Sequence, residues 1–316
     1  MRIKCTHGSR SHSLLESFLT FAIIICIISS CESDDTGNKV TIDGLKYYLY
    51  SSSREAVIDW ENSTYSGVLD IPSEVRHNGT VYTVTGIAAG AFLDCTELTK
   101  VRIPKTINHV VFHVLDGGNG AVSPENTNPF VGCTALESIE VDKDNPIMCS
   151  VDGVLFNKDK TRLYCFPAGL RQESYTIPEG VTWIGAYAFS YSQYLVSLQI
   201  PNTITEICSG ICSNCINLKT IRLSENINYI GGSSFEKCTS LRVLDIPEKV
   251  QSFGENVFRW THLETVIIRG TFPNGLRDDT FYFMDDKTVI YAQPSEIEKF
   301  KKVFSGTVLP LETVSR

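Results

Sequence analysis

IPEGVTWIGAYAFSYSQYLVSLQ (177–199), IPNTITEICSGICSNCINLKTIR (200–222) and LSENINYIGGSSFEKCTSLRVLD (223–245) are three successive segments of one 23-residue pattern. A fixed period of this length is the signature of a solenoid, because each coil cannot bury its apolar side alone and must stack on its neighbours. Three series of residues keep the 23-residue step: Val181, Ile204, Ile227 and Val250; Ile184, Ile207, Ile230 and Phe253; and Phe189, Cys212, Phe235 and Phe258.

Within one coil, the spacing of the apolar residues predicts a short strand with a single buried face. The last two apolar positions lie two residues apart, as in a strand, and a proline often follows, which cannot donate to a neighbouring ladder. We therefore expect parallel strands with Leu and Ile inside, Phe in the middle of each coil and a small Cys at a turn. The same offsets recur from Phe92 (Cys95, Leu98, Val101, Ile103), Phe130 (Cys133, Leu136, Ile139, Val141), Phe189 (Ser192, Leu195, Leu198, Ile200) and Phe235 (Cys238, Leu241, Leu244, Ile246).

Residues Ala91 to Pro104 fit the pattern A-F-x-x-C-x-x-L-x-x-[VIL]-x-I-P. This pattern resembles the BspA-type leucine-rich repeat of bacterial cell-surface proteins, and the resemblance covers roughly residues 40 to 310. It implies a β-rich leucine-rich-repeat solenoid with a parallel sheet, and a role in adhesion or ligand binding rather than catalysis. We accordingly expect no enzyme activity and no cofactor, and the partner stays open between an extracellular protein and a glycan.

The N-terminus has the layout of an export signal. Arg2, Lys4 and Arg10 precede the apolar run 18–28, which is too short for a permanent membrane helix. The run ends at Ile28-Ser29-Ser30-Cys31, which resembles the lipobox of bacterial lipoproteins. The resemblance implies cleavage of residues 1–30 and lipidation of Cys31; an ordinary secretory signal is the alternative. Several acyl chains would anchor the protein stably to a membrane.

Residues 31–40 begin with the acidic run Glu32-Ser33-Asp34-Asp35, which resembles the tether that routes such lipoproteins to the outer face of the outer membrane. A merely solvated linker is the alternative. Without residues 1–30, the 28 basic and 36 acidic residues become 25 and 35, a net charge of −10. An acidic chain without a basic stripe argues against nucleic acid as a partner. We expect a lipid-anchored outer-membrane protein exposed at the cell surface.

The period divides the rest of the chain. Residues 41–80, with the Asp43-Gly44 turn opening a strand, form an N-terminal cap, 81–270 the solenoid, and 271–316 a C-terminal cap. Two insertions interrupt the solenoid: 115–128 is polar and Gly-rich, and 142–176 predicts a hairpin covering one flank. The step shortens to 22 residues after Phe258. In the C-terminal cap, Ser295 to Glu298 predicts a capping box opening a helix that ends at Gly306.

Three constellations could be mistaken for metal sites. Cys208, Cys212 and Cys215 have the spacing of a radical S-adenosylmethionine cluster loop, but the coil register already accounts for Cys212 and Cys215. His109 and His113 are four residues apart but bracket a coil edge, and Asp142-Lys143-Asp144-Asn145-Pro146 is more typical of a turn than of a calcium loop. We interpret the eight cysteines after Cys31 as packing thiols, although export permits disulfides.

Strand alternation predicts which side chains face solvent. When Leu98, Val101 and Ile103 point inward, Lys100 and Arg102 point outward, and stacked strands set the equivalent pairs side by side. We hypothesise that Lys100, Arg102, Arg222 and Ile267 on this strip contact an extended partner. The alternative is a surface enzyme or glycan-utilisation component with its site on the inserted loops. The equivalent outward pairs are Ser138 and Glu140, Ser197 and Gln199, Thr220 and Arg222, Val243 and Asp245, and Thr265 and Ile267.

Overall fold

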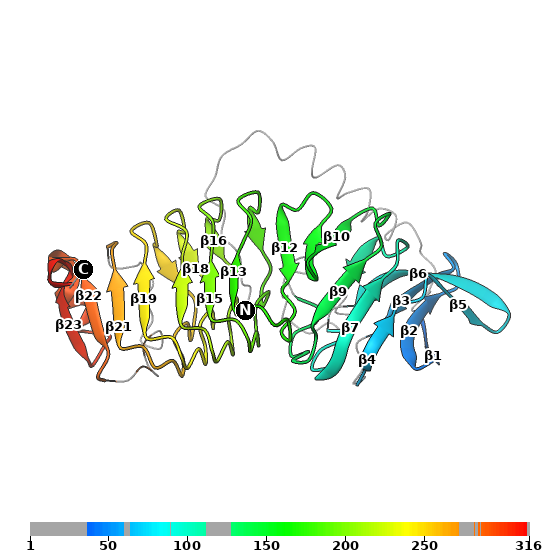
Figure 1. Cartoon of the computed structure of the whole chain (residues 1–316), viewed down its shortest axis with the longest axis horizontal. Coiled ribbons are helices and arrows are strands. Elements are labelled where there is room, and N and C mark those ends of the chain that lie inside the picture. The colour runs from blue at the N-terminus through cyan, green and yellow to red at the C-terminus, as the bar shows by residue number, and fades with distance from the viewer. Residues whose placement is uncertain are drawn as a thin grey trace.

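The computed structural model is an elongated stack of coils (Figure 1). It describes residues 37–59, 64–88, 90–111, 128–271, 281, 284 and 286–314. The expected signal peptide, Cys31, the start of the tether, His113 and residues 115–127 of the first insertion lie outside this range. Within the described ranges, no helix has the length and hydropathy to cross a membrane. The predicted β-rich solenoid of parallel strands is confirmed.

The N-terminal end of the stack carries a sheet of different construction, drawn in blue and cyan in Figure 1. The predicted Asp43-Gly44 turn joins β1 to β2, and both residues have positive φ, 48° and 83°. The sheet runs β1-β2-β3-β6-β5, with β8 also pairing β6. Antiparallel pairs give way to parallel ones at β3–β6 and β6–β8, so this sheet leads into the solenoid. Its strands are β1 (Asn38–Ile42), β2 (Leu45–Tyr50), β3 (Glu55–Ile58), β5 (Glu74–His77), β6 (Thr80–Ala88) and β8 (His109–Val111).

One side of the stack is formed by parallel sheets with one strand from each coil. Ser197 pairs with Thr220 at the 23-residue step, and Val243 pairs with Thr265 at the shortened step. The three sheets are β4-β7-β9, β13-β15-β17 and β19-β21-β22-β23. Their strands are β4 (Ser66–Asp70), β7 (Glu97–Ile103), β9 (Ser138–Val141), β13 (Ser174–Thr176), β15 (Ser197–Gln199), β17 (Thr220–Arg222), β19 (Val243–Ile246), β21 (Thr265–Ile268), β22 (Val289–Ala292) and β23 (Thr307–Pro310).

A second ladder of very short parallel strands runs along another side of the coils. It is the sheet β16-β18-β20 and contains Ile207, Ile230 and Phe253, all buried. Its strands are β16 (Glu206–Ile207), β18 (Tyr229–Ile230) and β20 (Ser252–Phe253). Ile184, the first member of the same 23-residue series, lies in β14 (Trp183–Ile184), which pairs instead with a strand of the second insertion.

The turns of each coil form a third set of contacts. Residues two positions after the Phe position adopt left-handed backbone conformations, at φ values of 61° for Tyr191, 61° for Asn214 and 58° for Lys237. This conformation is unfavourable for residues with a Cβ. Each of the three donates its N–H to a carbonyl of the next coil, at 2.9, 2.8 and 2.9 Å. The hydrogen bonds between coils offset the conformational cost, so the turns do not require glycine.

The predicted Phe column is the centre of the stack. Phe92 stacks on Phe130, with ring centroids 5.1 Å apart, and Phe235 stacks on Phe258 at 6.4 Å. The column extends beyond the predicted series at both ends, because Phe166 stacks on Phe189 and Phe281 on Phe258. Phe166 and Phe281 each lie 23 residues from the next member, so the period continues across both irregular regions.

The second insertion joins two hydrophobic cores. The N-terminal core contains Leu155 and Cys165, whereas the C-terminal core contains Phe156 and Phe166. The predicted hairpin is present as β11 (Val154–Asn157) and β12 (Arg162–Cys165), and the turn at Asp152-Gly153 adds a third strand, β10 (Met148–Val151). Strand β12 also pairs in parallel with β14. The insertion is therefore part of the stack as well as a connection between its halves.

The C-terminal end continues the parallel sheet through β22 and β23. Between them lie a 3-10 turn, η2 (Pro294–Glu296), and one α-helical turn, α2 (Ile297–Phe300); η3 (Leu311–Thr313) follows β23. The predicted capping box is wrong. Pro294 starts η2, so Ser295 lies inside that turn and no side chain caps either helix. The helix also ends at Phe300, before Gly306, and Phe300 and Phe304 are buried.

Candidate functional site

The sheet side presents its outward residues in rows, as strand alternation predicts. Lys100 is in register with Ser138 and Arg102 with Glu140. In the middle sheet, Gln199 is in register with Arg222. The inward residues Leu98, Val101, Ile139 and Leu198 of these strands are at most 1% exposed, and Ile221 is half-buried. The rows of the candidate face are therefore set by the same alternation that builds the core.

An ion-pair network occupies the N-terminal part of this face. Arg102 contacts Asp70 Oδ1 through Nη1 at 2.7 Å and Glu140 Oε2 through Nε at 2.8 Å. Lys100 Nζ contacts Glu140 Oε1 at 2.8 Å. The hydrogen bonds from Lys100 and then from Arg102 hold the pKa of the Glu140 carboxyl below its usual value. Lys100 and Arg102 therefore belong to a balanced network rather than to a basic patch, because two carboxylates on the neighbouring strands compensate the two bases.

Arg222 differs from Lys100 and Arg102. Its side chain is exposed on β17, and its neighbour in register is the uncharged Gln199. Among the residues that the structure describes, no carboxylate forms an ion pair with Arg222. Asp245, 23 residues further along, is bound instead by Arg269 through two hydrogen bonds of 2.7 and 2.6 Å. Unlike Lys100 and Arg102, Arg222 is thus a predicted contact residue whose charge is directed to solvent.

Ile267 does not form an exposed apolar end to the face. It is only 8% exposed and lies outside the core cluster that contains Val266 and Ile268. Its side chain points away from the core but is flanked in register by Asp245 and Tyr291. This outward position therefore lies between side chains of the two adjacent strands. The exposed apolar residue of this region is Val243, with 50% of its surface accessible.

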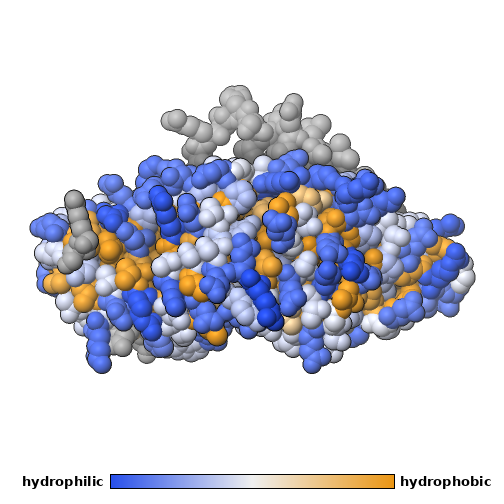
Figure 2. All heavy atoms as spheres, in the orientation of Figure 1, coloured by the Kyte–Doolittle hydropathy of each residue, from blue (hydrophilic) through white to orange (hydrophobic). Residues whose placement is uncertain are grey.

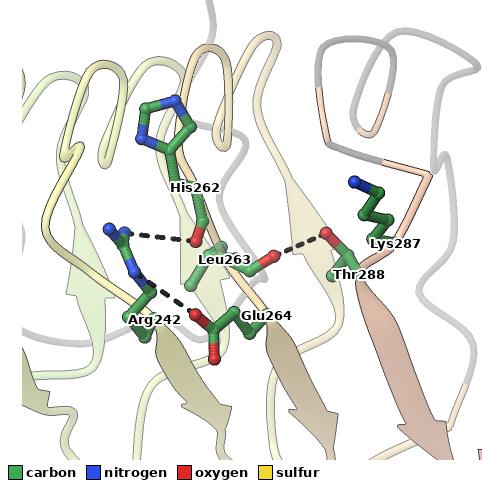
Figure 3. Close-up of a pocket in the computed structure, with 6 residues that line it drawn as sticks. All are labelled: Arg242, His262, Leu263, Glu264, Lys287 and Thr288. Carbon is green, nitrogen blue, oxygen red and sulfur yellow. Dashed lines mark hydrogen bonds and ion pairs between the residues drawn. The ribbon is translucent and has the colours of Figure 1, made fainter.

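A small pocket lies where β19, β21 and β22 begin (Figure 3). Its volume is about 290 Å³, and it is lined by Arg242, His262, Leu263, Glu264, Lys287 and Thr288. Arg242 Nη1 donates to the carbonyl oxygens of Thr239 and His262, at 2.7 and 3.3 Å, and Nε lies 3.4 Å from Glu264 Oε1. Thr288 Oγ1 donates to Leu263 O at 2.5 Å.

Sequence reasoning missed this pocket, although a signal was present. Arg242, Glu264 and Lys287 follow one another at steps of 22 and 23 residues, and each stands at or just before the start of a strand. Residues in one such column come together when the coils stack. The 23-residue register therefore predicts that these three residues are neighbours. Whether they enclose a pocket depends on the conformations of their side chains, which the register does not give.

The cysteines act as packing thiols that also donate hydrogen bonds. All eight in the described ranges are thiols. Cys133 Sγ donates to Phe92 O at 2.9 Å, Cys215 to Phe189 O at 2.9 Å, and Cys238 to Cys212 O at 3.1 Å. The hydrogen bond with Cys215 and then burial raise the pKa of Cys212 well above its usual value. This thiol is therefore held protonated, whereas a cluster ligand must be a thiolate.

Cys208 has a plain structural position. It takes the place that Gly185, Gly231 and Gly254 hold in other coils, where neighbouring backbones approach closely. Within the described ranges, no group of three or more His, Cys, Asp or Glu residues is arranged to hold a metal ion.

Asn145 explains the turn that follows β9. The residue is fully buried. Its Nδ2 donates to Pro104 O and Ile107 O, at 3.0 and 2.8 Å, and its Oδ1 accepts from the backbone N–H groups of Ile147 and Met148. These bonds tie the insertion to the preceding coil, so the turn interpretation is confirmed. His109 lies in β8, where burial lowers its pKa.

The stacked coils, the parallel sheet and the regular Phe and Cys columns define a leucine-rich-repeat solenoid. The chain belongs to the family of the BspA type leucine-rich repeat region, whose model matches six copies over residues 77–117 and 159–285. The predicted resemblance is therefore confirmed.

Two solved structures have the same fold. One is the pneumococcal vaccine antigen PcpA, with a TM-score of 0.52 and 17% identity over 87% of this chain and 98% of that chain. The other is a leucine rich cell surface protein from Faecalibacterium prausnitzii, with a TM-score of 0.50 and 17% identity over 88% of this chain and all of that chain. No curated protein matches the sequence. At these identities the likeness shows the fold alone.

Proposed function

We propose that this chain is a binding protein, lipid-anchored at the outer membrane of a bacterial cell, whose sheet face holds an extended extracellular protein or glycan. The single observation that carries the proposal is the register of the outward rows. Neighbouring strands set Ser197 beside Thr220 and Gln199 beside Arg222, and Lys100 beside Ser138. A repeated row of side chains along a rigid scaffold suits a long partner, and solenoids commonly bind through such surfaces.

The chemistry of the surface supports a polar partner. One broad face of the stack shows apolar patches separated by polar side chains (Figure 2). In the middle sheet the outward residues are Ser, Gln, Thr and Arg, which donate and accept hydrogen bonds. Arg222 adds a charged contact that can bind a carboxylate or a sulfate through two parallel bonds. We therefore infer that Arg222 is the main anchor and that Lys100 and Arg102 contribute less, since their charges are already paired.

Two further considerations support a surface location. The structural relative from Faecalibacterium prausnitzii is described as a cell surface protein, and the pneumococcal relative is a vaccine antigen. The sequence Ile28-Ser29-Ser30-Cys31 provides a lipidation site of the lipoprotein kind. A lipid anchor at one end of a long solenoid would leave the sheet face accessible to extracellular partners.

The binding proposal is tested with Arg222→Glu. Protein and glycan arrays first identify a partner, and the affinity of the variant for that partner is then measured. Reversal of an anchoring charge should weaken binding by at least about 10-fold, while the unfolding midpoint stays nearly constant because the residue is exposed. Lys302→Glu makes the same charge change on an exposed residue outside the sheet and should leave affinity unchanged.

Lys100 and Arg102 are tested as Lys100→Gln and Arg102→Gln rather than by charge reversal. Reversal would bring new acids against Asp70 and Glu140 and disturb the fold. Binding that survives all three changes but disappears on deletion of residues 116–126 would refute the sheet face as the site.

Anchoring is tested separately with Cys31→Ala in cells supplied with a labelled fatty acid. The variant should lose the acyl label and either remain unprocessed or leave the membrane fraction. A variant that still carries the label would exclude lipidation at Cys31.

A further inference from the structure

We propose that the pocket of Arg242, His262 and Lys287 binds the carboxylate of an acidic sugar residue. This site is distinct from the sheet face of the proposed function. The sheet face is formed by outward residues within the strands, whereas the pocket is built from residues at and before the starts of β19, β21 and β22. It needs neither a lipid anchor nor an extended partner.

The Arg242 guanidinium is held in place and still reaches solvent. Its contacts to Thr239 O, His262 O and Glu264 use Nη1 and Nε. A guanidinium carries five N–H donors, so the two on Nη2 are not used in these contacts. The side chain is 46% exposed. Arg242 is thus oriented by the turn below it and can present a pair of donors to an anion without losing those bonds.

The local charge favours an anion in a chain that is acidic as a whole. The pocket combines two cationic side chains, Arg242 and Lys287, with a single carboxylate, Glu264, while the formal net charge of the whole sequence is −8. Glu264 lies against Arg242 and orients it. Figure 3 shows Arg242 and His262 on one side of the pocket and Lys287 with Thr288 on the other. Cationic groups on two sides of a concave site raise the local concentration of anions.

The size and lining of the pocket select the kind of anion. A volume of about 290 Å³ is at the lower limit of the roughly 300–1,000 Å³ that small-molecule sites occupy. It has room for one sugar ring. Leu263 and Thr288 are only 2% and 1% exposed, so the lining side chains that can reach a ligand are those of Arg242, His262, Glu264 and Lys287. His262 and Glu264 supply polar atoms for hydroxyl groups. A uronic acid combines one carboxylate with several hydroxyls and meets both conditions.

The test is an NMR titration of the purified protein with glucuronic acid, glucose and glutamate. Glucuronic acid should shift the signals of residues around the pocket, and glucose should bind at least about 10-fold more weakly because it lacks the charge. Equal binding of glucose and glucuronic acid would refute the carboxylate contact. Equal binding of glutamate and glucuronic acid would refute the sugar specificity, and no binding of glucuronic acid would refute the site.

Variants then assign the contact. Arg242→Gln and Lys287→Gln should each weaken glucuronic acid binding by about 10-fold or more. Arg222→Gln removes the same charge from the sheet face and serves as the matched control, with binding unchanged. If Arg242→Gln lowers the unfolding midpoint because it loses the bonds to the turn, Lys287→Gln alone decides the outcome. Unchanged affinity in Lys287→Gln, or loss in Arg222→Gln, would overturn the assignment. Failure here leaves the sheet-face proposal intact, since that proposal depends on Arg222.

Discussion

The N-terminal and C-terminal cores contain coils of the same plan, but their outer faces differ. In the sheet β4-β7-β9, Asp70, Lys100, Arg102 and Glu140 form a continuous ion-pair network across three strands. In the sheet β13-β15-β17, the outward side chains are neutral apart from Arg222. The inner positions of both sheets pack against the core, with Val101, Ile139 and Leu198 buried and Leu69, Tyr175 and Ile221 half-buried. Core packing therefore constrains the inner face alike in both halves, and the outer face is free to differ.

The ends of the two halves differ as well. The N-terminal core is closed by a sheet that contains antiparallel pairs, whereas the C-terminal core is closed by two more parallel strands and a single helical turn. Residues 148–166 contribute neighbouring side chains to both cores. This sharing predicts that the two halves unfold together despite their different construction.

The largest expected effect tests that coupling. Phe92→Ala in the N-terminal core and Phe235→Ala in the C-terminal core each remove a fully buried ring, which costs about 3–5 kcal/mol of unfolding free energy. Urea unfolding followed by circular dichroism and by tryptophan fluorescence should show one shared transition for both variants. Val243→Ala, at an exposed outward position, should change stability by less than about 0.5 kcal/mol. Two separate transitions would show that the cores are independent folding units.

A smaller effect is expected from the thiol column, which a serine interrupts in the coil of Phe189. Ser192 takes the Cys position after Phe189, is fully buried, and its hydroxyl has no hydrogen-bond partner among the described residues. The equivalent acceptor would be Phe166 O, because the other coils use the carbonyl of the preceding Phe position. The C–O bond is shorter than the C–S bond, which explains why a serine fails where a cysteine reaches.

Ser192→Cys should therefore stabilise the protein by about 1 kcal/mol, and Cys215→Ser should destabilise it by about 1–3 kcal/mol by leaving a buried hydroxyl unpaired. Both values are measured from urea midpoints under reducing conditions. Ser190→Cys, in the same turn but already bonded to Tyr187 O, is the control and should not stabilise. A destabilised Ser192→Cys would show that the column is filled by size alone.

The smallest effect is expected from the ion-pair network. Its contribution to the stability of the protein should depend on pH, unlike that of the largely neutral outer face of the middle sheet. The ion pairs lower the pKa of Glu140 in the folded state, so their contribution is fully present above the unfolded pKa of about 4.3. It is lost as the pH falls through the lower folded pKa. Glu140→Gln should flatten the dependence of the unfolding midpoint on pH in that acidic range, and high salt should reduce the difference. Glu179→Gln changes an exposed glutamate on another part of the surface and should leave the profile unchanged. An unaltered profile for Glu140→Gln would mean that the network contributes nothing to stability.

The sequence alone determined the period, the inward residues and the parallel stacking of this protein. The positions of Leu98, Phe189 and Cys215 recur in other coils at fixed offsets, because every coil must bury its apolar side. The pattern found in one coil therefore supports the assignment of inward residues in the next. The Cys positions were recognised by their size, but their hydrogen bonds were not, since the acceptor lies 26 residues away in the Cys215 case.

Only the tertiary structure decided what the outer surface offers. The period shows that Arg102 and Glu140 are neighbours, but the pairing of charges and the exposure of Arg222 depend on side-chain conformations that burial does not constrain. Ile267 points outward by alternation yet is covered by its neighbours in register. The pocket at Arg242 exists because a turn carbonyl and Glu264 hold the guanidinium in one orientation. The inward positions follow the same rule in every coil, whereas exposure and charge pairing depend on which side chains the adjacent coils bring together.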